Sequence, residues 1–202
     1  MMLQDDTICA ISTPHGVGGI AVARVSGANA ITIVDRVWQG KPLSDATSHT
    51  AHLGTVVDER GEAIDQAVAT IFRAPRSFTG ENVVEIAVHG SRWVQRELIN
   101  LLVRTGCRVA DAGEFTRRAF ANGRLDLAEA EAVADVIASS SRAAHRIAMS
   151  QMRGDFSRRL TDLHDRLLEL ASLLELELDF SEEDVEFASR QKLLEIAQEI
   201  HS

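Results

Sequence analysis

The spacing of hydrophobic residues along the chain changes near residue 113. Before this point, short apolar runs alternate with glycines, prolines and polar turns. After it no proline occurs, and apolar residues recur every three or four positions. Short alternating runs are typical of strands, and the longer spacing is typical of helices. The sequence therefore predicts an α+β fold in which a mixed sheet region is followed by an all-helical region.

In the first region the pattern predicts a sheet with two helices. Strands are expected at 7–10, 20–25, 52–58, 65–73, 82–88 and 107–110, and helices at 28–38 and 92–105. Ser91 is a good N-cap for the second helix, and Gly106 should end it. Both faces of the central strands are largely apolar, so we expect the sheet to be covered on both sides.

The stretch GEFTRRAFANGRLDLAEAEAV at 113–133 joins the two regions. Its start indicates a basic turn, and Asn122-Gly123 is a breaker pair. One helix is expected from about Leu125 to Met152 and a second after Gly154, followed by a third at 188–200. Leucines at 160, 163, 167, 170 and 174 form a packing seam on the second helix. The acidic run 175–186 is interpreted as a solvated face and turn rather than a metal site. The third helix stops with its apolar face half unpaired, which favours a fragment of a longer protein.

Composition and charge narrow the possible environments and partners. The net charge is −9. Residues 1–112 hold ten basic and twelve acidic residues, and residues 113–202 hold eleven basic and eighteen acidic residues. Any contact with nucleic acid would therefore need a local basic cluster. Aromatic residues are only 4%, and no aromatic-and-basic surface for single strands is indicated. Neither a signal peptide nor a membrane-spanning run is expected, and the two isolated cysteines, Cys9 and Cys107, favour a reduced, cytoplasmic chain.

The loop Gly16–Gly19 and the histidines give weak indications of chemistry. The loop lacks the phosphate-binding pattern GxxxxGK[ST] and leads into a strand, so a tight turn or a close backbone approach is the favoured interpretation. The histidines at 15, 49, 52 and 89 share no metal-ligand spacing. No catalytic arrangement and no metal site is predicted.

Three charged residues lie where charge is unexpected. Arg24 and Glu85 interrupt apolar strands, so each must be exposed or paired. They could form a structural ion pair or lie on an edge strand. Alternatively they could bind a ligand, since a carboxylate accepts from an amidine-like N–H edge and an arginine holds a carboxylate. Arg124 lies near a helix start, where the dipole disfavours a cation. Arg117 and Arg118 are expected to be surface charges.

Three segments in this order resemble the MnmE (TrmE) family of tRNA modification GTPases. They are TICAISTPHGVGGIAVARVSG, SFTGENVVEIAVHG and GEFTRRAFANGRLDLAEAEAVADVI. The resemblance implies a folate-binding and dimerisation domain at 1–118, similar to the glycine cleavage T protein. It also implies the first part of a helical domain at 119–202. By the same resemblance the folate contacts fall on Arg24, Glu85 and Arg124, where the last is Lys or Arg in the family.

The resemblance also implies an activity for the parent protein. Such an enzyme hydrolyses GTP and, with the FAD-dependent partner MnmG, adds an aminomethyl or carboxymethylaminomethyl group to C5 of the wobble uridine (U34) of tRNA. The cofactor is 5-formyltetrahydrofolate or another reduced folate. GTP, Mg²⁺ and K⁺ would bind only in the parent's GTPase domain, since this sequence has no P-loop. The family's Cys-x-Gly-Lys tail is also missing, so the fragment should bind folate and form a homodimer without catalysing.

Two alternatives differ in class from this interpretation. The chain could be a non-enzymatic scaffold that recruits tRNA or a protein, which would not bind folate and whose RNA affinity would fall steeply with salt. A free-standing aminomethyltransferase is a third possibility, although the chain length and the end of the last helix argue against it.

Overall fold

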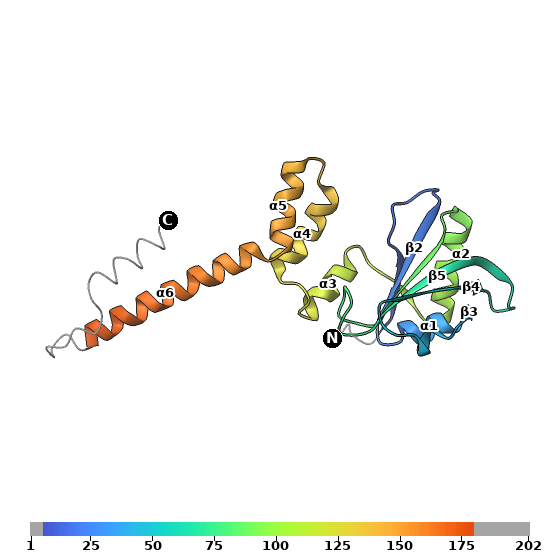
Figure 1. Ribbon diagram of the computed structural model, residues 1–202, viewed down its shortest axis with the longest axis horizontal. Helices are drawn as coiled ribbons and strands as arrows, with labels where there is room; N and C mark the ends of the chain where they lie inside the picture. The colour runs from blue at the N-terminus through green and yellow to red at the C-terminus, as the bar shows by residue number, and fades with distance from the viewer. Residues whose placement is uncertain (1–5, 180–202) are drawn as a thin grey trace. The chain divides into compact units, whose positions relative to one another are not determined.

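The structure is a computed structural model, and it describes residues 6–179. The chain divides into two compact units, Met1–Asp126 and Leu127–Ser202. Figure 1 shows that the first unit holds the sheet and that the second is helical. A mixed sheet followed by helices confirms the predicted α+β fold class. No helix among the described residues has the length and apolar character needed to cross a membrane.

The first unit is built on one seven-stranded sheet with the order β3-β4-β5-β6-β2-β1-β7. All neighbouring strands are antiparallel except β1 and β7, which are parallel. The strands are β1 (Ile8–Ile11), β2 (Ile20–Ser26), β3 (Trp38–Gly40), β4 (Thr50–Val57), β5 (Ala63–Phe72), β6 (Val83–His89) and β7 (Arg108–Val109). Six of them match predicted strands. The strand β3 was missed, because Trp38 completed the apolar spacing of the predicted helix 28–38.

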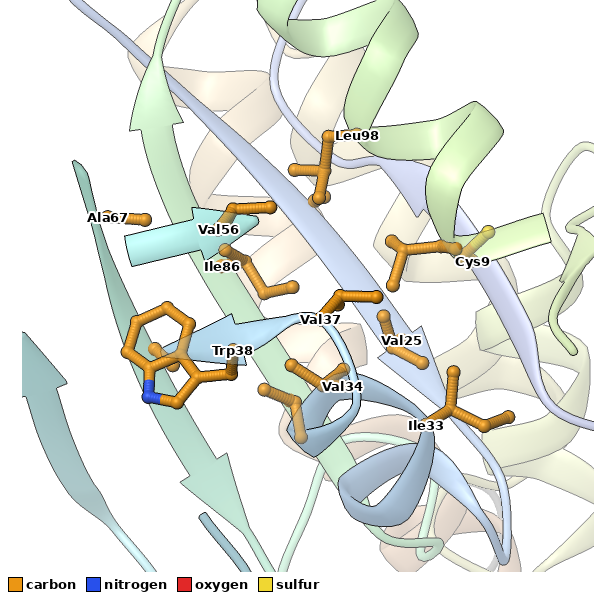
Figure 2. Packing of buried hydrophobic residues seen from close by; sticks show 14 of the residues in the cluster. Cys9, Val25, Ile33, Val34, Val37, Trp38, Val56, Ala67, Ile86 and Leu98 are labelled. Carbon is orange, nitrogen blue, oxygen red and sulfur yellow. The ribbon is translucent and has the colours of Figure 1, made fainter. Parts of the chain in front are cut away.

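One face of this sheet carries the hydrophobic core. Alternate residues of β2 and β6 are buried on it: Ala21, Ala23, Val25, Val84, Ile86 and Val88. They pack in one cluster with Val34 of α1 (Ala30–Asp35) and Leu98 of α2 (Arg92–Thr105). Figure 2 shows Val25 and Ile86 of the sheet in the same hydrophobic cluster as these two helical residues. We call this the closed face.

The opposite face of the sheet is not covered along its whole length. Val68 of β5 lies opposite Ala87 of β6 and next to Leu53 of β4. Leu53 is 66% exposed and Val68 is 38% exposed. The prediction that the sheet is covered on both sides is therefore wrong for the described chain. Apolar residues on both faces indicate two covered faces, but they do not require that this chain supplies the second cover. We call this the open face.

The helices of the first unit include one, α2, that follows its local capping signals. Besides α1 and α2 they are the short 3₁₀ helix η1 (Leu43–Asp45) and α3 (Glu114–Ala121). The bounds of α2 are as predicted: the Ser91 side chain accepts from the Val94 N–H, and Gly106 follows with a φ of 122°. The predicted basic turn at 113–118 is wrong, because this segment is the start of α3.

The second unit is helical throughout its described part. Its helices are α4 (Leu127–Ala138), α5 (Arg142–Met152) and α6 (Asp155–Asp179). Figure 1 shows α4 and α5 side by side. The single predicted helix 125–152 is thus wrong. Ser141 caps α5 by accepting from the Ala144 N–H, so the chain turns here without a glycine or proline to signal it. The start of α6 after Gly154 is confirmed, whereas the predicted helix 188–200 and most of the acidic run 175–186 lie outside the described residues.

Candidate functional site

Arg24 and Glu85 form an ion pair on the open face of the sheet. They are directly opposite each other in the antiparallel ladder between β2 and β6. Arg24 Nε donates to Glu85 Oε1 at 2.9 Å, and Arg24 Nη2 lies 2.7 Å from the same oxygen. Their side chains are 24% and 29% exposed, so both are half-buried but reachable from solvent. The ion pair that the sequence left open is therefore present, and it lies on an accessible surface.

Two phenylalanine rings flank the guanidinium of Arg24. Its Cζ lies 5.2 Å from the ring centroid of Phe78 and 5.4 Å from that of Phe115. Both distances are within the range of cation–π attraction. Phe78 comes from the loop 73–82 between β5 and β6, and Phe115 comes from the first turn of α3. Two segments far apart in the sequence therefore meet over one arginine.

The loop 73–82 is held in place by its own polar side chains. Thr79 is fully buried and its hydroxyl lies 2.7 Å from Ser26 Oγ, which also donates to Glu81 Oε2. Ser77 Oγ donates to the backbone carbonyl of Glu81 at 2.6 Å. Ser26 lies on the same face of β2 as Arg24, because the two are two positions apart along the strand. The loop therefore covers one end of the open face, and the Arg24–Glu85 pair lies where this cover stops.

Arg124 reaches the same loop from the end of α3. Its Nε donates to the backbone carbonyl of Ser77 at 3.2 Å. A Cβ placed on Gly80 would lie 3.1 Å from Arg124 Cγ, so the bare glycine, at a φ of 78°, lets the arginine chain pack close. Gly123, at a φ of 66°, turns the chain after α3 and confirms the predicted break at Asn122-Gly123.

A buried network of charges fixes α3 to the sheet. Glu114 is 1% exposed and accepts from Arg108 Nη2 at 2.6 Å, from Arg118 Nη2 at 3.2 Å and from the Asp111 N–H at 2.7 Å. The hydrogen bond from Arg108 is the main reason that the pKa of Glu114 falls to about 2, and the Asp111 N–H and Arg118 lower it further against the effect of burial. Glu114 is therefore a carboxylate at neutral pH.

Arg118 links this network to the start of the chain and to the loop 73–82. It is 7% exposed, and its Nη1 donates to the backbone carbonyl of Asp6 at 2.9 Å and to Glu81 Oε1 at 3.2 Å. Burial acts to lower the pKa of Arg118, but the carboxylates of Glu81, Asp6 and Glu114 outweigh burial and raise it. The prediction that Arg118 is a surface charge is wrong, whereas Arg117 is half-exposed.

The structure thus places the three candidate residues at or beside the loop 73–82, through different contacts. Arg24 and Glu85 contact each other, and Arg24 also contacts Phe78, whereas Arg124 contacts Ser77 and Gly80 of the same loop. The phenylalanines and the Glu114 network were missed by sequence reasoning. One signal for the network was available, since Glu114 and Arg118 are four residues apart on a helix. Within residues 6–179 no three His, Cys, Asp or Glu side chains gather as metal ligands would.

Comparison with known families assigns both units. Residues 7–124 match the family described as GTP-binding protein TrmE N-terminus, and residues 127–202 match the MnmE helical domain. Each of these matches begins or ends within a few residues of the boundary between the two compact units. Together they account for nearly the whole chain.

Curated relatives agree with this assignment. The tRNA modification GTPase MnmE of Flavobacterium johnsoniae is 52% identical over 202 residues, covering 98% of this chain and 43% of the relative. That of Flavobacterium psychrophilum is 55% identical over 192 residues, covering 94% and 41%. That of Parabacteroides distasonis is 53% identical over 199 residues, covering 96% and 43%. The chain spans less than half the length of these relatives, and it belongs to the MnmE (TrmE) family as its N-terminal and helical part.

Proposed function

We propose that this chain is the folate-binding and dimer-forming part of a tRNA modification GTPase. Arg24, Glu85 and Arg124 would bind a reduced folate such as 5-formyltetrahydrofolate. The whole protein, with the FAD-dependent partner MnmG, would use it to add an aminomethyl or carboxymethylaminomethyl group to C5 of wobble uridine 34 in cytoplasmic tRNA. GTP, Mg²⁺ and K⁺ would act in the parent's GTPase domain, and the two-domain division at 118/119 belongs to the same proposal.

The observation that carries the folate proposal is the accessible Arg24–Glu85 pair beside two aromatic rings. Arg24 engages only Oε1 of the glutamate, and within the described residues Oε2 has no hydrogen-bond partner. A carboxylate held in this way can accept from the N–H edge of a pterin. Phe78, which is 37% exposed, offers an apolar surface for a flat ring. The exposed guanidinium of Arg124 suits the carboxylate tail of the ligand.

The open face supports the homodimer in this proposal. Leu53, Val68 and Ile20 are exposed there and would lose apolar surface to water if a second copy covered them. Exposed apolar side chains that gather on one sheet face are typical of protein–protein contacts. The face also carries Arg24 and Glu85, so a second copy would lie near the ligand.

A calorimetric titration of the chain with 5-formyltetrahydrofolate tests the proposal. Glu85→Gln keeps the shape of the side chain and removes its charge. Loss of this charged contact should cost about 2–3 kcal/mol, which is a tens- to hundredfold loss of affinity. Glu62→Gln is the matched control, because Glu62 is an exposed carboxylate in the turn between β4 and β5. Equal affinity in the two variants, with folding intact, would remove Glu85 from the site.

A further inference from the structure

A second site of the first unit lies on α2 and shares no residue with the candidate folate site. It is a cavity of about 520 Å³ between α2 and the loop that follows β1. Ile11 and His15 line it from the loop side, and Arg92, Arg96, Ile99 and Asn100 line it from the helix. Cavities of this size hold small ligands or single nucleotide units.

The wall of the cavity is fixed by close contacts of the glycine loop. Gln95 Nε2 donates to the carbonyls of Gly16 at 3.0 Å and Gly90 at 3.1 Å. The Gly18 N–H donates to the Gly90 carbonyl, and a Cβ on Gly90 would lie 2.5 Å from the Gly18 oxygen. This confirms the predicted close backbone approach of the loop. The loop therefore stays against the first turns of α2, and the cavity has a defined shape.

The cavity is cationic although the chain as a whole is acidic. Arg92 and Arg96 are one helical turn apart and project from the same side of α2. Within the described residues Arg92 has no hydrogen-bond or ion-pair partner, and Arg96 has only a 3.6 Å contact with Glu97. No aspartate or glutamate is among the residues that line the cavity. In a chain with a net charge of −9, such a place concentrates anions that the rest of the surface repels.

An exposed aromatic residue lies on α2 near the arginines of this cavity, although it does not line the cavity itself. Trp93 is 53% exposed, and it lies seven residues from Asn100, so both project from nearly the same side of α2. The low aromatic content gave no indication of such a surface, but one tryptophan beside two arginines is sufficient to form it. Arginines bind phosphate in a fork and an exposed indole stacks on a base.

We propose that this cavity binds a phosphodiester group of RNA through Arg92 and Arg96, with the neighbouring base against Trp93. The inference rests on the proposed role in tRNA modification and locates one RNA contact of that protein. Ile11 and Ile99 form the apolar part of the cavity, against which a ribose or base can pack. Stacking and phosphate binding together favour RNA over a simple inorganic anion.

Fluorescence anisotropy of a labelled anticodon stem-loop RNA, with uridine at the wobble position, tests this proposal on the whole chain. Arg92→Gln/Arg96→Gln should weaken binding at least about tenfold at about 50 mM salt. The slope of log K against log salt should become less steep by about 1.5, as expected for two lost phosphate contacts. Arg36→Gln/Arg60→Gln removes the same charge at exposed positions of the same unit and should change neither quantity appreciably.

Intrinsic fluorescence gives a second measurement. The chain has two tryptophans, of which Trp38 is 8% exposed and Trp93 is 53% exposed. RNA should quench the emission of Trp93 in the unmodified chain and not in Arg92→Gln/Arg96→Gln. Equal RNA affinity in the two double variants, or no RNA binding by the unmodified chain, would overturn the inference. Folate titration of the same samples tests the folate site separately, because Arg92→Gln/Arg96→Gln should bind 5-formyltetrahydrofolate unchanged.

Discussion

Both faces of the seven-stranded sheet carry apolar residues, but they differ in what covers them. On the closed face, valines, isoleucines and alanines of β2 and β6 are buried against α1 and α2. On the open face, Leu53 and Val68 are exposed, and the face carries the Arg24–Glu85 pair. The comparison teaches that hydrophobic alternation identifies the sheet surfaces that are suited to burial. Which of these surfaces the chain covers with its own helices depends on the rest of the sequence.

The largest expected effect comes from removing a core side chain behind the closed face. Leu98→Ala should lower the free energy of unfolding by about 2–5 kcal/mol, because the side chain is fully buried and leaves a cavity. Leu53→Ala on the open face should cost less than about 0.5 kcal/mol in the single chain. Urea unfolding at several protein concentrations measures both. Comparable losses would break the distinction between the two faces.

The next effect concerns the charges that hold α3 over the end of the open face. Glu114→Gln should destabilise the first unit by about 3 kcal/mol, because Arg108 and Arg118 lose a buried partner. The matched control is Glu62→Gln, which removes an exposed carboxylate and should leave stability nearly unchanged. Urea unfolding of the two variants provides the measurement, and a small loss in Glu114→Gln would mean that the network is not needed for folding.

The same carboxylate should make stability depend on pH. In the folded chain the pKa of Glu114 lies at about 2, below its ordinary value of 4.5, mainly because Arg108 hydrogen-bonds to it. A lowered pKa stabilises the folded chain above pH 4.5, and this stabilisation is lost as the pH falls towards 2. Stability of the unmodified chain should thus decline over this interval. The decline should be shallower in Glu114→Gln, and the lowered pKa of Asp6 should account for part of what remains.

The smallest effect on folding stability is expected for a substitution that changes the oligomeric state. Leu53→Lys places a charge on the open face and should convert the proposed homodimer into monomers, with little change in the stability of the single chain. Val103→Lys is the control, because Val103 is 41% exposed on α2. Sedimentation velocity of both variants measures the outcome. A dimer that persists in Leu53→Lys would place the subunit contact elsewhere.

The sequence predicted those parts of the fold that depend on local signals. The helix α2 was predicted with its exact bounds because Ser91 and Gly106 supply a cap and a stop. The break before α5 was missed, because a serine cap within a polar stretch does not interrupt the apolar spacing. The short helix α3 was missed for a different reason, since three of its eight residues are charged and this cluster indicated a basic turn.

The sequence predicted the candidate site only as charged residues at positions where apolar or neutral residues are expected. Arg24 and Glu85 could be singled out because each interrupts an apolar strand. Their pairing could not be derived, because it depends on the register between β2 and β6, which are 61 positions apart at this pair. The burial of Arg118 was likewise hidden, since its partners Asp6 and Glu81 are distant in the sequence.

The charge network also sets an order of events during synthesis of the protein. Its members come from the beginning of the chain, the loop before β6, the strand β7 and the helix α3. A nascent chain that has not yet released α3 from the ribosome can form much of the sheet, but Asp6, Glu81 and Arg108 then lack their shared partners. Phe115 and Arg124 arrive with or just after that helix, so the side chains of the candidate site come together only when the last of these segments has emerged.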